Sequence, residues 1–408
     1  MNKFHRNIFL NLLHALERVF INKSRASKVL LNIVHINPKW GKRDREVVYD
    51  AFYSIIRWKK KYEFYLNEKI SLNVKNDIIK LIGVWTILNN YKANSQPELS
   101  NLNYKQIISN SKKKITENSI LNSIPKWIDE IGLKELPNTW NKEIKSLNSK
   151  AKVSIRVNTL KINRDKLQEI LLKKYSIETE KTLKYPEALI LIKKKNILKN
   201  TLYKRGYFEV QDANSQLIAP YSLCEPKMNV IDACAGAGGK SLHLSTIMKN
   251  QGNIIAMDIN PSKLIELKKR MIRNNIKIIK PTLIKKDENL KKYFSYADRV
   301  IIDAPCSGIG TLKRNPELKW KLKKDSFKKI LKKQEKIINI YSKLVKPNGK
   351  LIYSTCSILP SENQKQIKKF LKTKNGDKFK LEDESFYSTI NCNFDGFYSA
   401  RLSKKNCG

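Results

Sequence analysis

The hydrophobic pattern of the first 140 residues is that of a helical domain. Apolar residues recur every three or four positions, which is typical of amphipathic helices, and glycine and proline are sparse. Four helical faces are predicted, within residues 8–19, 29–34, 47–56 and 78–88. We therefore expect an all-helical domain over residues 1–140.

The pattern changes to alternation after residue 140. Residues 153–158 alternate like a strand, 164–172 are helix-like, and 188–192 form a continuous apolar run typical of a buried strand. Residues 206–212 then lead into a predicted helix over 213–221. These features predict a small α+β subdomain over residues 141–212.

Strands and helices alternate regularly from residue 213 onward. This order favours an α/β fold with a mostly parallel, doubly wound, Rossmann-like sheet, and it predicts a catalytic domain over residues 213–408. The expected strands are 229–233, 253–258, 282–285, 299–303 and 350–354, and the expected helices are 261–275 and 326–345.

A glycine-rich turn follows the first strand of this domain. Gly236, Gly238 and Gly239 allow a ligand to approach the backbone, and Asp258, 22 residues after Gly236, ends the next strand. That spacing suits a carboxylate that binds a ribose diol. The turn departs from G-x-G-x-x-G, and Cys234 replaces the first glycine of a P-loop, so S-adenosylmethionine, which has no pyrophosphate, fits better than a dinucleotide. An ordinary tight turn is the alternative.

The charge of the chain favours a nucleic-acid partner. Its 408 residues include 81 Lys and Arg against 37 Asp and Glu, a formal net charge of +44. An AT-rich genome would explain the preference for Lys but not an imbalance of this size, which favours a polyanion, with a membrane surface as the lesser alternative. Lys42, Arg43, Arg45 and Arg57 could form a basic face, although a solvated helix surface is the ordinary interpretation of each of them. The segment with Lys193 to Lys195 suits contact with an RNA backbone, with a structural adapter as the alternative, and residues 319–336 are expected to form a basic amphipathic helix that faces solvent or RNA.

The cysteine and histidine pattern argues against a metal site. The six cysteines form no C-x-x-C pair, and only four histidines occur. Scattered cysteines are typical of a reducing compartment, and no apolar run approaches the ~20 residues that span a bilayer. We expect a cytoplasmic monomer that binds RNA, with no metal, no export and no membrane. The cysteines are 224, 234, 306, 356, 392 and 407.

Two cysteines stand just after predicted strands. Cys306 follows Asp303 and Pro305, and Cys356 follows Thr355. Ligand sites of open α/β sheets lie at the carboxyl ends of the strands, so both thiols should reach one crevice beside the glycine-rich turn. Inert packing is the ordinary interpretation of one buried cysteine, but two in this position favour chemistry.

The chemistry that fits is methylation at carbon 5 of a pyrimidine. Carbon 5 is a poor nucleophile until a thiolate adds to carbon 6, after which it can attack a methyl donor. Asp303 is placed to hold the edge of the base or the amino group of the cofactor. The target base must be unstacked or single-stranded.

The chain resembles the RsmB/Nop2/Sun family of RNA 5-methylcytosine methyltransferases over about residues 150–403. The resemblance implies that Cys356 is the nucleophile and that Cys306 assists elimination and product release. It also implies S-adenosylmethionine contacts from Cys234, Ala235, Gly236, Ala237, Gly238, Gly239, Lys240, Asp258, Asp287 and Asp303. The motifs that carry it are Arg156–Thr159, Val210–Asp212, Ser215–Gln216, Asp232–Lys240, Asp258, Asp287, Asp303–Gly308, Arg314–Glu317 with Trp320, Ser354–Ser357 and Asp395–Phe397.

The first 140 residues resemble, more weakly, the NusB-like RNA-binding domain of bacterial rRNA enzymes of this family. Asp44–Glu46 and Tyr53–Arg57 carry this similarity, which favours 16S rRNA over tRNA. One departure is that Gly236 and Ala237 replace the Ala-Pro of the family turn. The alternatives are a non-catalytic RNA-binding assembly factor, and the same chemistry on tRNA or DNA.

Overall fold

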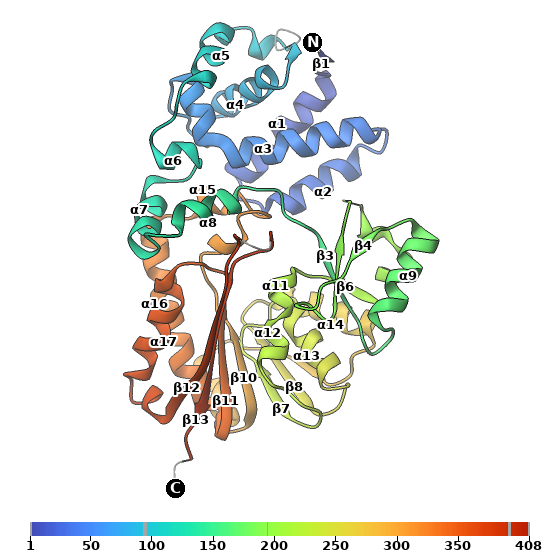
Figure 1. Ribbon diagram of the computed structural model, residues 1–408, viewed down its shortest axis with the longest axis vertical. Helices are drawn as coiled ribbons and strands as arrows, with labels where there is room; N and C mark the ends of the chain where they lie inside the picture. Colours follow the sequence, from blue (N-terminus) through green and yellow to red (C-terminus); the bar gives the residue numbers. More distant parts are fainter. Residues whose placement is uncertain (1, 93–95, 194, 391–392, 407–408) are drawn as a thin grey trace. The chain divides into compact units, whose positions relative to one another are not determined.

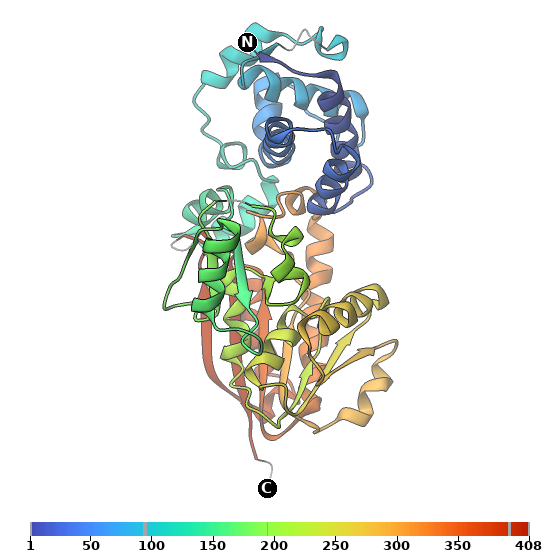
Figure 2. The ribbon, with the colours of Figure 1, turned by 90° about the vertical axis from the view of Figure 1, so that its right-hand side faces the viewer.

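The computed structural model describes residues 2–92, 96–193, 195–390 and 393–406, so Lys194, Cys392 and Cys407 lie outside the described residues. The chain forms two compact units (Figures 1 and 2). One contains residues 1–149 together with 311–324, and the other contains 150–310 together with 325–408. None of the helices in the described ranges combines the length and the apolar character needed to cross a bilayer.

The first unit is helical, as predicted, apart from one short ladder. The two-residue strands β1 (Asn2–Lys3) and β2 (Tyr91–Lys92) pair in parallel. Propensity could not predict this pairing, because the strands are short and distant in the chain. The helices are α1 (Arg6–Phe20), α2 (Ala26–Ile36), α3 (Lys42–Leu66), α4 (Lys75–Leu88), η2 (Pro97–Leu99), α5 (Tyr104–Lys112), α6 (Asn118–Leu121), α7 (Lys126–Glu135), α8 (Trp140–Leu147) and α15 (Leu318–Lys321).

Helix α3 shows how the sequence builds this unit. Val48, Phe52 and Ile56 follow one another at helical spacing and are fully buried. The carboxylate of Asp44 accepts a hydrogen bond of 3.0 Å from the Gly41 backbone N–H, which satisfies a donor at the start of the helix. The helix ends at Asn67 in the left-handed conformation. Its buried face packs against α4 in a single apolar core.

Residues 311–324 belong to the helical unit although they lie far along the chain. The Lys319 ammonium donates to the Arg57 carbonyl at 2.8 Å, and the Trp320 indole N–H donates to the Ile56 carbonyl at 2.6 Å. Lys319 is 1% exposed, and burial lowers its pKa well below the usual value. The expectation of one solvent-facing basic helix over 319–336 is therefore wrong. An extended residue, Leu322, separates α15 from α16 (Lys324–Tyr341).

The α+β segment forms an antiparallel sheet of four strands in the order β4-β5-β3-β6. The expected strands over 153–158 and 188–192 and the helix over 164–172 are present, whereas β4 and β6 were not predicted. The elements are β3 (Ser154–Val157), α9 (Arg164–Tyr175), β4 (Thr179–Glu180), β5 (Ala188–Leu191), η3 (Ile197–Lys199), α10 (Thr201–Lys204) and β6 (Phe208–Val210).

The rest of the second unit contains a sheet of seven strands in the order β12-β13-β11-β10-β7-β8-β9. Strands β7 to β11 run parallel, and β13 is antiparallel to both neighbours. The strands are β7 (Asn229–Asp232), β8 (Asn253–Asp258), β9 (Ile279–Leu283), β10 (Ala297–Asp303), β11 (Val345–Thr355), β12 (Phe379–Tyr387) and β13 (Phe397–Lys404). The helical elements are α11 (Ala213–Gln216), α12 (Ile218–Tyr221), α13 (Gly239–Ile247), α14 (Pro261–Asn274), η4 (Asp287–Tyr293), η5 (Ile309–Thr311), α16, η6 (Ser342–Leu344), η7 (Pro360–Glu362), α17 (Gln364–Leu371) and η8 (Gly376–Lys378).

Helices cover both faces of this sheet (Figure 1). Successive strand residues alternate between faces, so Ile231 joins the core under α16 and α17 whereas Val230 joins the core under α13 and α14. The strand expected at 282–285 lies at 279–283, and the helix expected over 213–221 is two short helices. The β12–β13 hairpin was not predicted. The carboxyl ends of β7, β8, β10 and β11 meet at one edge, which positions the site.

Candidate active site

The glycine-rich turn connects β7 to α13. Gly236 and Gly238 have φ of 55° and 80°, where side chains are strained. A Cβ on Gly238 would meet the Leu267 side chain at 2.1 Å, whereas a Cβ on Gly236 or Gly239 would meet nothing within 4 Å. Gly238 is therefore required for packing against α14, and the turn is open at Gly236 and Gly239.

Asp258 ends β8 and holds the turn. Its carboxylate accepts hydrogen bonds of 2.8 Å from the backbone N–H groups of Gly236 and Asn260. Two further hydrogen bonds fix the backbone of the turn, since Arg270 donates to the Ala237 carbonyl at 2.7 Å and the Ala235 N–H donates to the Met257 carbonyl at 2.9 Å. The predicted spacing thus brings the carboxylate to the turn.

Lys240 and Asp303 form an ion pair beside the turn. Lys240 stands in the first turn of α13, Asp303 is the last residue of β10, and the ammonium donates to the carboxylate at 2.5 Å. Burial opposes the charge of Lys240, but its attraction to Asp303 and the hydrogen bond that it donates to Asp303 outweigh this effect and raise the pKa of Lys240. Attraction to a negative charge on Cys356 contributes in the same direction.

Asp232 lies beneath the turn and was not among the predicted site residues. It is 1% exposed, and Ser241 donates to one of its oxygens at 2.6 Å. Its other oxygen has no hydrogen-bond partner among the described residues. Burial raises the pKa of Asp232 to about 6. The sequence signal that could have identified Asp232 as a site residue is its position at the end of a strand, before the glycine-rich turn.

The sulfur atoms of Cys306 and Cys356 lie 3.1 Å apart. Their strands β10 and β11 are adjacent and parallel, with Asp303 opposite Ser354, so the loops that follow emerge side by side. The contact with Cys356 and burial raise the pKa of Cys306 well above its ordinary value, so Cys306 keeps its proton at neutral pH. The expectation that both thiols reach one place is confirmed.

Arg156 connects the α+β segment to the turn and was missed as a site residue. Its guanidinium donates to the Gly239 carbonyl at 2.7 Å, and also to the side chain of Gln211. Arg156 is 2% exposed, and burial lowers its pKa to about 10. The Arg156–Thr159 motif was the sequence signal that could have identified Arg156 as a site residue. The distance along the chain gave no reason to place Arg156 beside residue 239.

Asp287 and Cys234 are the other residues outside the glycines that were predicted to contact the cofactor. Asp287 begins η4 after β9 and pairs with Lys336 of α16 at 2.7 Å, with both side chains more than half exposed. Cys234 lies in the turn, and burial strongly raises the pKa of its thiol. In the described ranges, no group of three or more His, Cys, Asp and Glu side chains is arranged to hold a metal ion.

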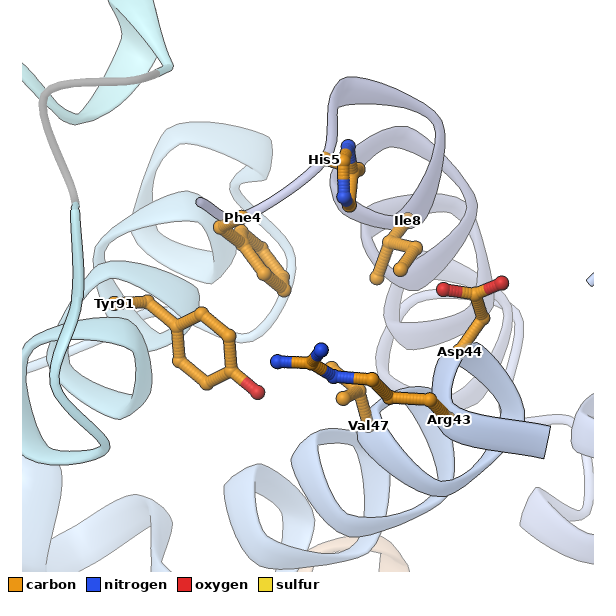
Figure 3. A pocket seen from close by; sticks show the side chains of 7 residues that line it. All are labelled: Phe4, His5, Ile8, Arg43, Asp44, Val47 and Tyr91. Carbon is orange, nitrogen blue, oxygen red and sulfur yellow. The ribbon is translucent and has the colours of Figure 1, made fainter. Parts of the chain in front are cut away.

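A separate pocket lies in the helical unit (Figure 3). Arg43, one of the expected basic residues, extends across it toward Tyr91. Arg57 is instead buried and donates to the Lys313 carbonyl at 3.0 Å, so it is not part of a basic surface. None of the predicted catalytic residues lines this pocket, whose walls are Phe4, His5, Ile8, Arg43, Asp44, Val47 and Tyr91.

The mostly parallel sheet, the glycine-rich turn and the strand-end acid define the Rossmann-like class of methyltransferases. A family model described as 16S rRNA methyltransferase RsmB/F matches residues 222–402, and a model of the ferredoxin-like domain of RsmF/B-like methyltransferases matches residues 124–198. The chain belongs to the RsmB/F family of 16S rRNA methyltransferases. The predicted family and fold class are confirmed, and S-adenosylmethionine is the cofactor that this membership supports.

Curated relatives extend the similarity. Ribosomal RNA small subunit methyltransferase B of Shewanella oneidensis is 30% identical over 339 residues, which are 80% of this chain and 75% of the relative. The probable ribosomal RNA small subunit methyltransferase B of Synechocystis sp. is 33% identical over 258 residues, 61% of this chain and 56% of the relative. The chain thus spans little more than half of the Synechocystis protein.

Solved structures share the fold. The crystal structure of PH0851 has a TM-score of 0.84 at 24% identity and covers 98% of this chain and 99% of that protein. The structure of NSun6 from Pyrococcus horikoshii has a TM-score of 0.63 at 20% identity, covering 70% of this chain and 99% of that one. The likeness to PH0851 extends over nearly all of this chain.

Proposed function

We propose that this protein transfers a methyl group from S-adenosylmethionine to carbon 5 of a cytosine in 16S rRNA, through a covalent bond between Cys356 and carbon 6. The observation that carries the proposal is the pair of strand-end thiols with sulfur atoms 3.1 Å apart. A methyltransferase that acted on a nitrogen or oxygen atom would need no thiol nucleophile.

The residues of the turn would hold the cofactor. The open side at Gly236 and Gly239 would receive the nucleoside, and Asp258, which accepts a hydrogen bond from the turn, would bind the ribose hydroxyls. The predicted contacts from Cys234, Asp287 and the rest of the turn belong to the same proposal. When bound, S-adenosylmethionine supplies an electrophilic methyl group on a sulfonium centre.

Cys356 acts as a thiolate in the first step. Its sulfur forms a bond to carbon 6 of the cytosine, and the electron pair of the 5,6 double bond moves onto carbon 5, delocalised through carbon 4 to ring nitrogen 3, which makes carbon 5 an enamine-like nucleophile. The Lys240 ammonium, whose pKa is raised by Asp303 and by attraction to Cys356, favours this negative charge. Carbon 5 would then take the methyl group, and the bond from the methyl carbon to the sulfonium sulfur would break with its electron pair on that sulfur.

Elimination restores the base. A basic group removes the proton from carbon 5, the double bond re-forms, and the bond between carbon 6 and the Cys356 sulfur breaks with its electron pair on sulfur. Cys306 keeps its proton and stands 3.1 Å from that sulfur, so it can hydrogen-bond the departing thiolate. This supports a role for Cys306 in product release.

Asp303 is proposed to position the reactants. Its carboxylate is fixed by Lys240 and remains one-third exposed, so an oxygen is accessible to a ligand. An amino group, either of the cytosine or of the cofactor, is the donor that suits it.

The proposed substrate is RNA. A formal net charge of +44 suits a polyanion, and the names of the curated relatives specify small-subunit rRNA. The α+β segment, the helical unit and their lysines are proposed to contact the RNA backbone, with the protein acting as a cytoplasmic monomer. The same chemistry on tRNA is the second candidate, because the cysteine pair does not distinguish the RNA.

The test combines a purified and a cellular measurement. The protein is incubated with labelled S-adenosylmethionine and either small ribosomal subunit RNA or total tRNA, and the products are mapped by bisulfite sequencing. We expect one protected cytosine in 16S rRNA, absent from cells without the gene. Methylation of tRNA alone would replace the substrate, and full activity of Cys356→Ala would refute the mechanism.

A further inference from the structure

The loops that carry Cys306 and Cys356 are joined by one buried carboxylate. Glu362, at the end of η7, is 0% exposed. The Ser307 backbone N–H donates to it at 2.8 Å, and the hydroxyls of Ser307 and Ser357 both donate to its second oxygen. Ser307 and Ser357 each follow one of the two cysteines directly in the chain. A single side chain thus fixes the residue after each thiol.

Glu362 is itself held from two sides. The Gln334 amide of α16 donates to Glu362 at 3.1 Å and to the Pro305 carbonyl, just before Cys306, at 3.0 Å. The Tyr353 hydroxyl of β11 donates to the Glu362 backbone carbonyl at 2.8 Å. The carboxylate therefore cannot shift without also moving the strand or the helix.

Asn363, the residue after Glu362, contacts the residues on both sides of Cys356. The Asn363 side chain accepts from the Thr355 hydroxyl at 2.6 Å and donates to the Ser357 carbonyl at 3.0 Å. Thr355 and Ser357 flank Cys356 in the chain. Residues 362 and 363 together hold the backbone on both sides of that thiol.

Burying a carboxylate costs free energy, which makes this group an unfavourable one for a purely structural bridge. Burial disfavours its charge and raises the pKa of Glu362, although the hydrogen bonds from Ser307 and Ser357 oppose the rise. An ionised carboxylate accepts in every direction, whereas an amide of the same size must also donate. The four donors that converge on Glu362 suit the ionised acid.

We propose that Glu362 is a positioning residue that sets the separation and mutual orientation of the Cys306 and Cys356 thiols. It touches neither sulfur in the structure and acts through Ser307 and Ser357. The inference rests on the proposed function, in which Cys356 must attack carbon 6 while Cys306 stays within reach of the same sulfur. A change in this alignment slows the chemistry and leaves cofactor binding intact.

The first experiment compares Glu362→Gln with Glu335→Gln in the full chain. Glu335 is the matched control, because it lies on α16 next to Gln334 but pairs with Lys369 on the surface. For Glu362→Gln we expect kcat to fall by about 10²-fold, the scale of a small misplacement of reacting groups, with KM for S-adenosylmethionine within about twofold. Glu335→Gln should match the wild type.

The second experiment measures the thiol geometry without any methyl transfer. Diamide converts adjacent thiols to a disulfide, and peptide mapping by mass spectrometry gives the rate for Cys306 with Cys356. We expect this rate to fall by about tenfold in Glu362→Gln. Ser307→Ala and Ser357→Ala, which each remove one donor, should give smaller losses in both assays and serve if Glu362→Gln does not fold.

The outcomes separate the two proposals. Unchanged kcat and unchanged disulfide rate in the folded Glu362 and serine variants would overturn the positioning role. A fall in kcat accompanied by an equal loss of S-adenosylmethionine binding would also overturn it, because it would indicate general damage. If the wild type methylates no RNA, the proposed function fails, while a slower disulfide rate in Glu362→Gln would still support the positioning role.

Discussion

Cys306 and Cys356, 50 residues apart in the chain, have their sulfur atoms 3.1 Å from each other at the ends of two adjacent parallel strands. One thiol can therefore keep its proton and donate a hydrogen bond to the other sulfur. This arrangement suits a thiolate nucleophile beside a group that carries a proton. The pKa of Cys306, raised by its contact with Cys356 and by burial, assigns the proton to Cys306.

The two cysteines should give different phenotypes. Cys356→Ala removes the proposed nucleophile, and we expect methyl transfer to fall by roughly 10⁴-fold or more. Cys306→Ala leaves the attack possible but removes the group proposed to assist elimination, so a covalent protein–RNA adduct should accumulate. Transfer of labelled methyl groups to RNA measures the first effect, and denaturing gel electrophoresis with labelled RNA measures the second.

Cys224 is the control for these two variants. It is a buried thiol whose pKa burial raises to about 11, and it belongs to the apolar core. Cys224→Ala should methylate RNA at the wild-type rate and form no adduct. An adduct in Cys356→Ala, or none in Cys306→Ala, would reverse or remove the proposed roles.

Lys240 and Asp303 should be energetically coupled. Removing either partner leaves a charged group unpaired in the site, so Lys240→Met and Asp303→Asn should each weaken S-adenosylmethionine binding by about 10- to 100-fold. Both single variants lose the same ion pair, so the double variant should bind S-adenosylmethionine about as weakly as either single variant. The expected coupling free energy between the two residues is about 1–3 kcal/mol. Titration calorimetry on the four proteins gives this value, and additive losses would show that the pair is not a unit.

The glycines of the turn should differ in their tolerance of a methyl group. Gly236→Ala places its Cβ in open space, so the cost is limited to the backbone strain of about 1–2 kcal/mol, and cofactor binding should survive, as expected from the Ala that the family turn commonly has there. Gly238→Ala adds a contact at 2.1 Å with Leu267, and we expect a loss of about 3 kcal/mol or more in the free energy of unfolding.

Urea unfolding and calorimetry with S-adenosylmethionine test this pair of glycine variants. Equal destabilisation by the two alanines would contradict the different packing of the two sides of the turn. Loss of binding in Gly236→Ala with unchanged stability would instead place the ligand directly against that Cα.

Asp232 should make stability depend on pH in a defined window. Its folded pKa of about 6 lies above the ordinary value of 3.8, so its contribution to stability is fully present below about pH 3.8 and is lost as the pH rises through about 6. The increase of the Asp232 pKa from 3.8 to about 6 corresponds to about 3 kcal/mol of lost folding stability at neutral pH. Asp232→Asn should therefore be more stable than the wild type by up to this amount at pH 8, with little difference near pH 4.

Chemical unfolding across pH 4 to 8 measures the difference between the two proteins. Asp165→Asn is the control, because Asp165 is exposed and its pKa is lowered by its bond to Lys181, so this variant should show no gain at high pH. A stability difference for Asp232→Asn that does not change with pH would show that Asp232 is not the titrating group.

Trp320 should stabilise the helical unit rather than the catalytic sheet. Trp320→Ala loses the hydrogen bond to the Ile56 carbonyl and the packing of a partly buried indole against the helical core, and we expect a loss of about 2 kcal/mol, less than for a fully buried aromatic. Hydrogen exchange resolved by segment should show faster exchange in α3, with β10 and β11 unchanged as the internal control. Faster exchange confined to the sheet would contradict this assignment.

Local patterns along the chain were sufficient for the main elements. The period of about 3.6 residues predicted the helices of the first unit, and buried apolar runs predicted the ends of β7, β8, β10 and β11 to within five residues. The pattern also predicted that Asp258 ends the strand after the glycine-rich turn, whereas its hydrogen bond with Gly236 was visible only in the structure. The β12–β13 hairpin escaped prediction, because its polar edge strand carries no clear apolar alternation.

The sequence by itself determined which residues make up the candidate site, because two thiols after strands and a glycine-rich turn are local features. Only the tertiary structure decided how these features are joined. Lys319 is an ordinary lysine by spacing, yet the fold buries it in the helical unit. Glu362 reaches Ser307, and Arg156 reaches the glycine-rich turn, across contacts between distant segments, and no periodicity encodes such contacts. The sequence predicted that Cys306 and Cys356 would meet, but only the pairing of their strands in the folded sheet fixed the separation of the sulfur atoms at 3.1 Å, because distances between loops depend on the packing around them.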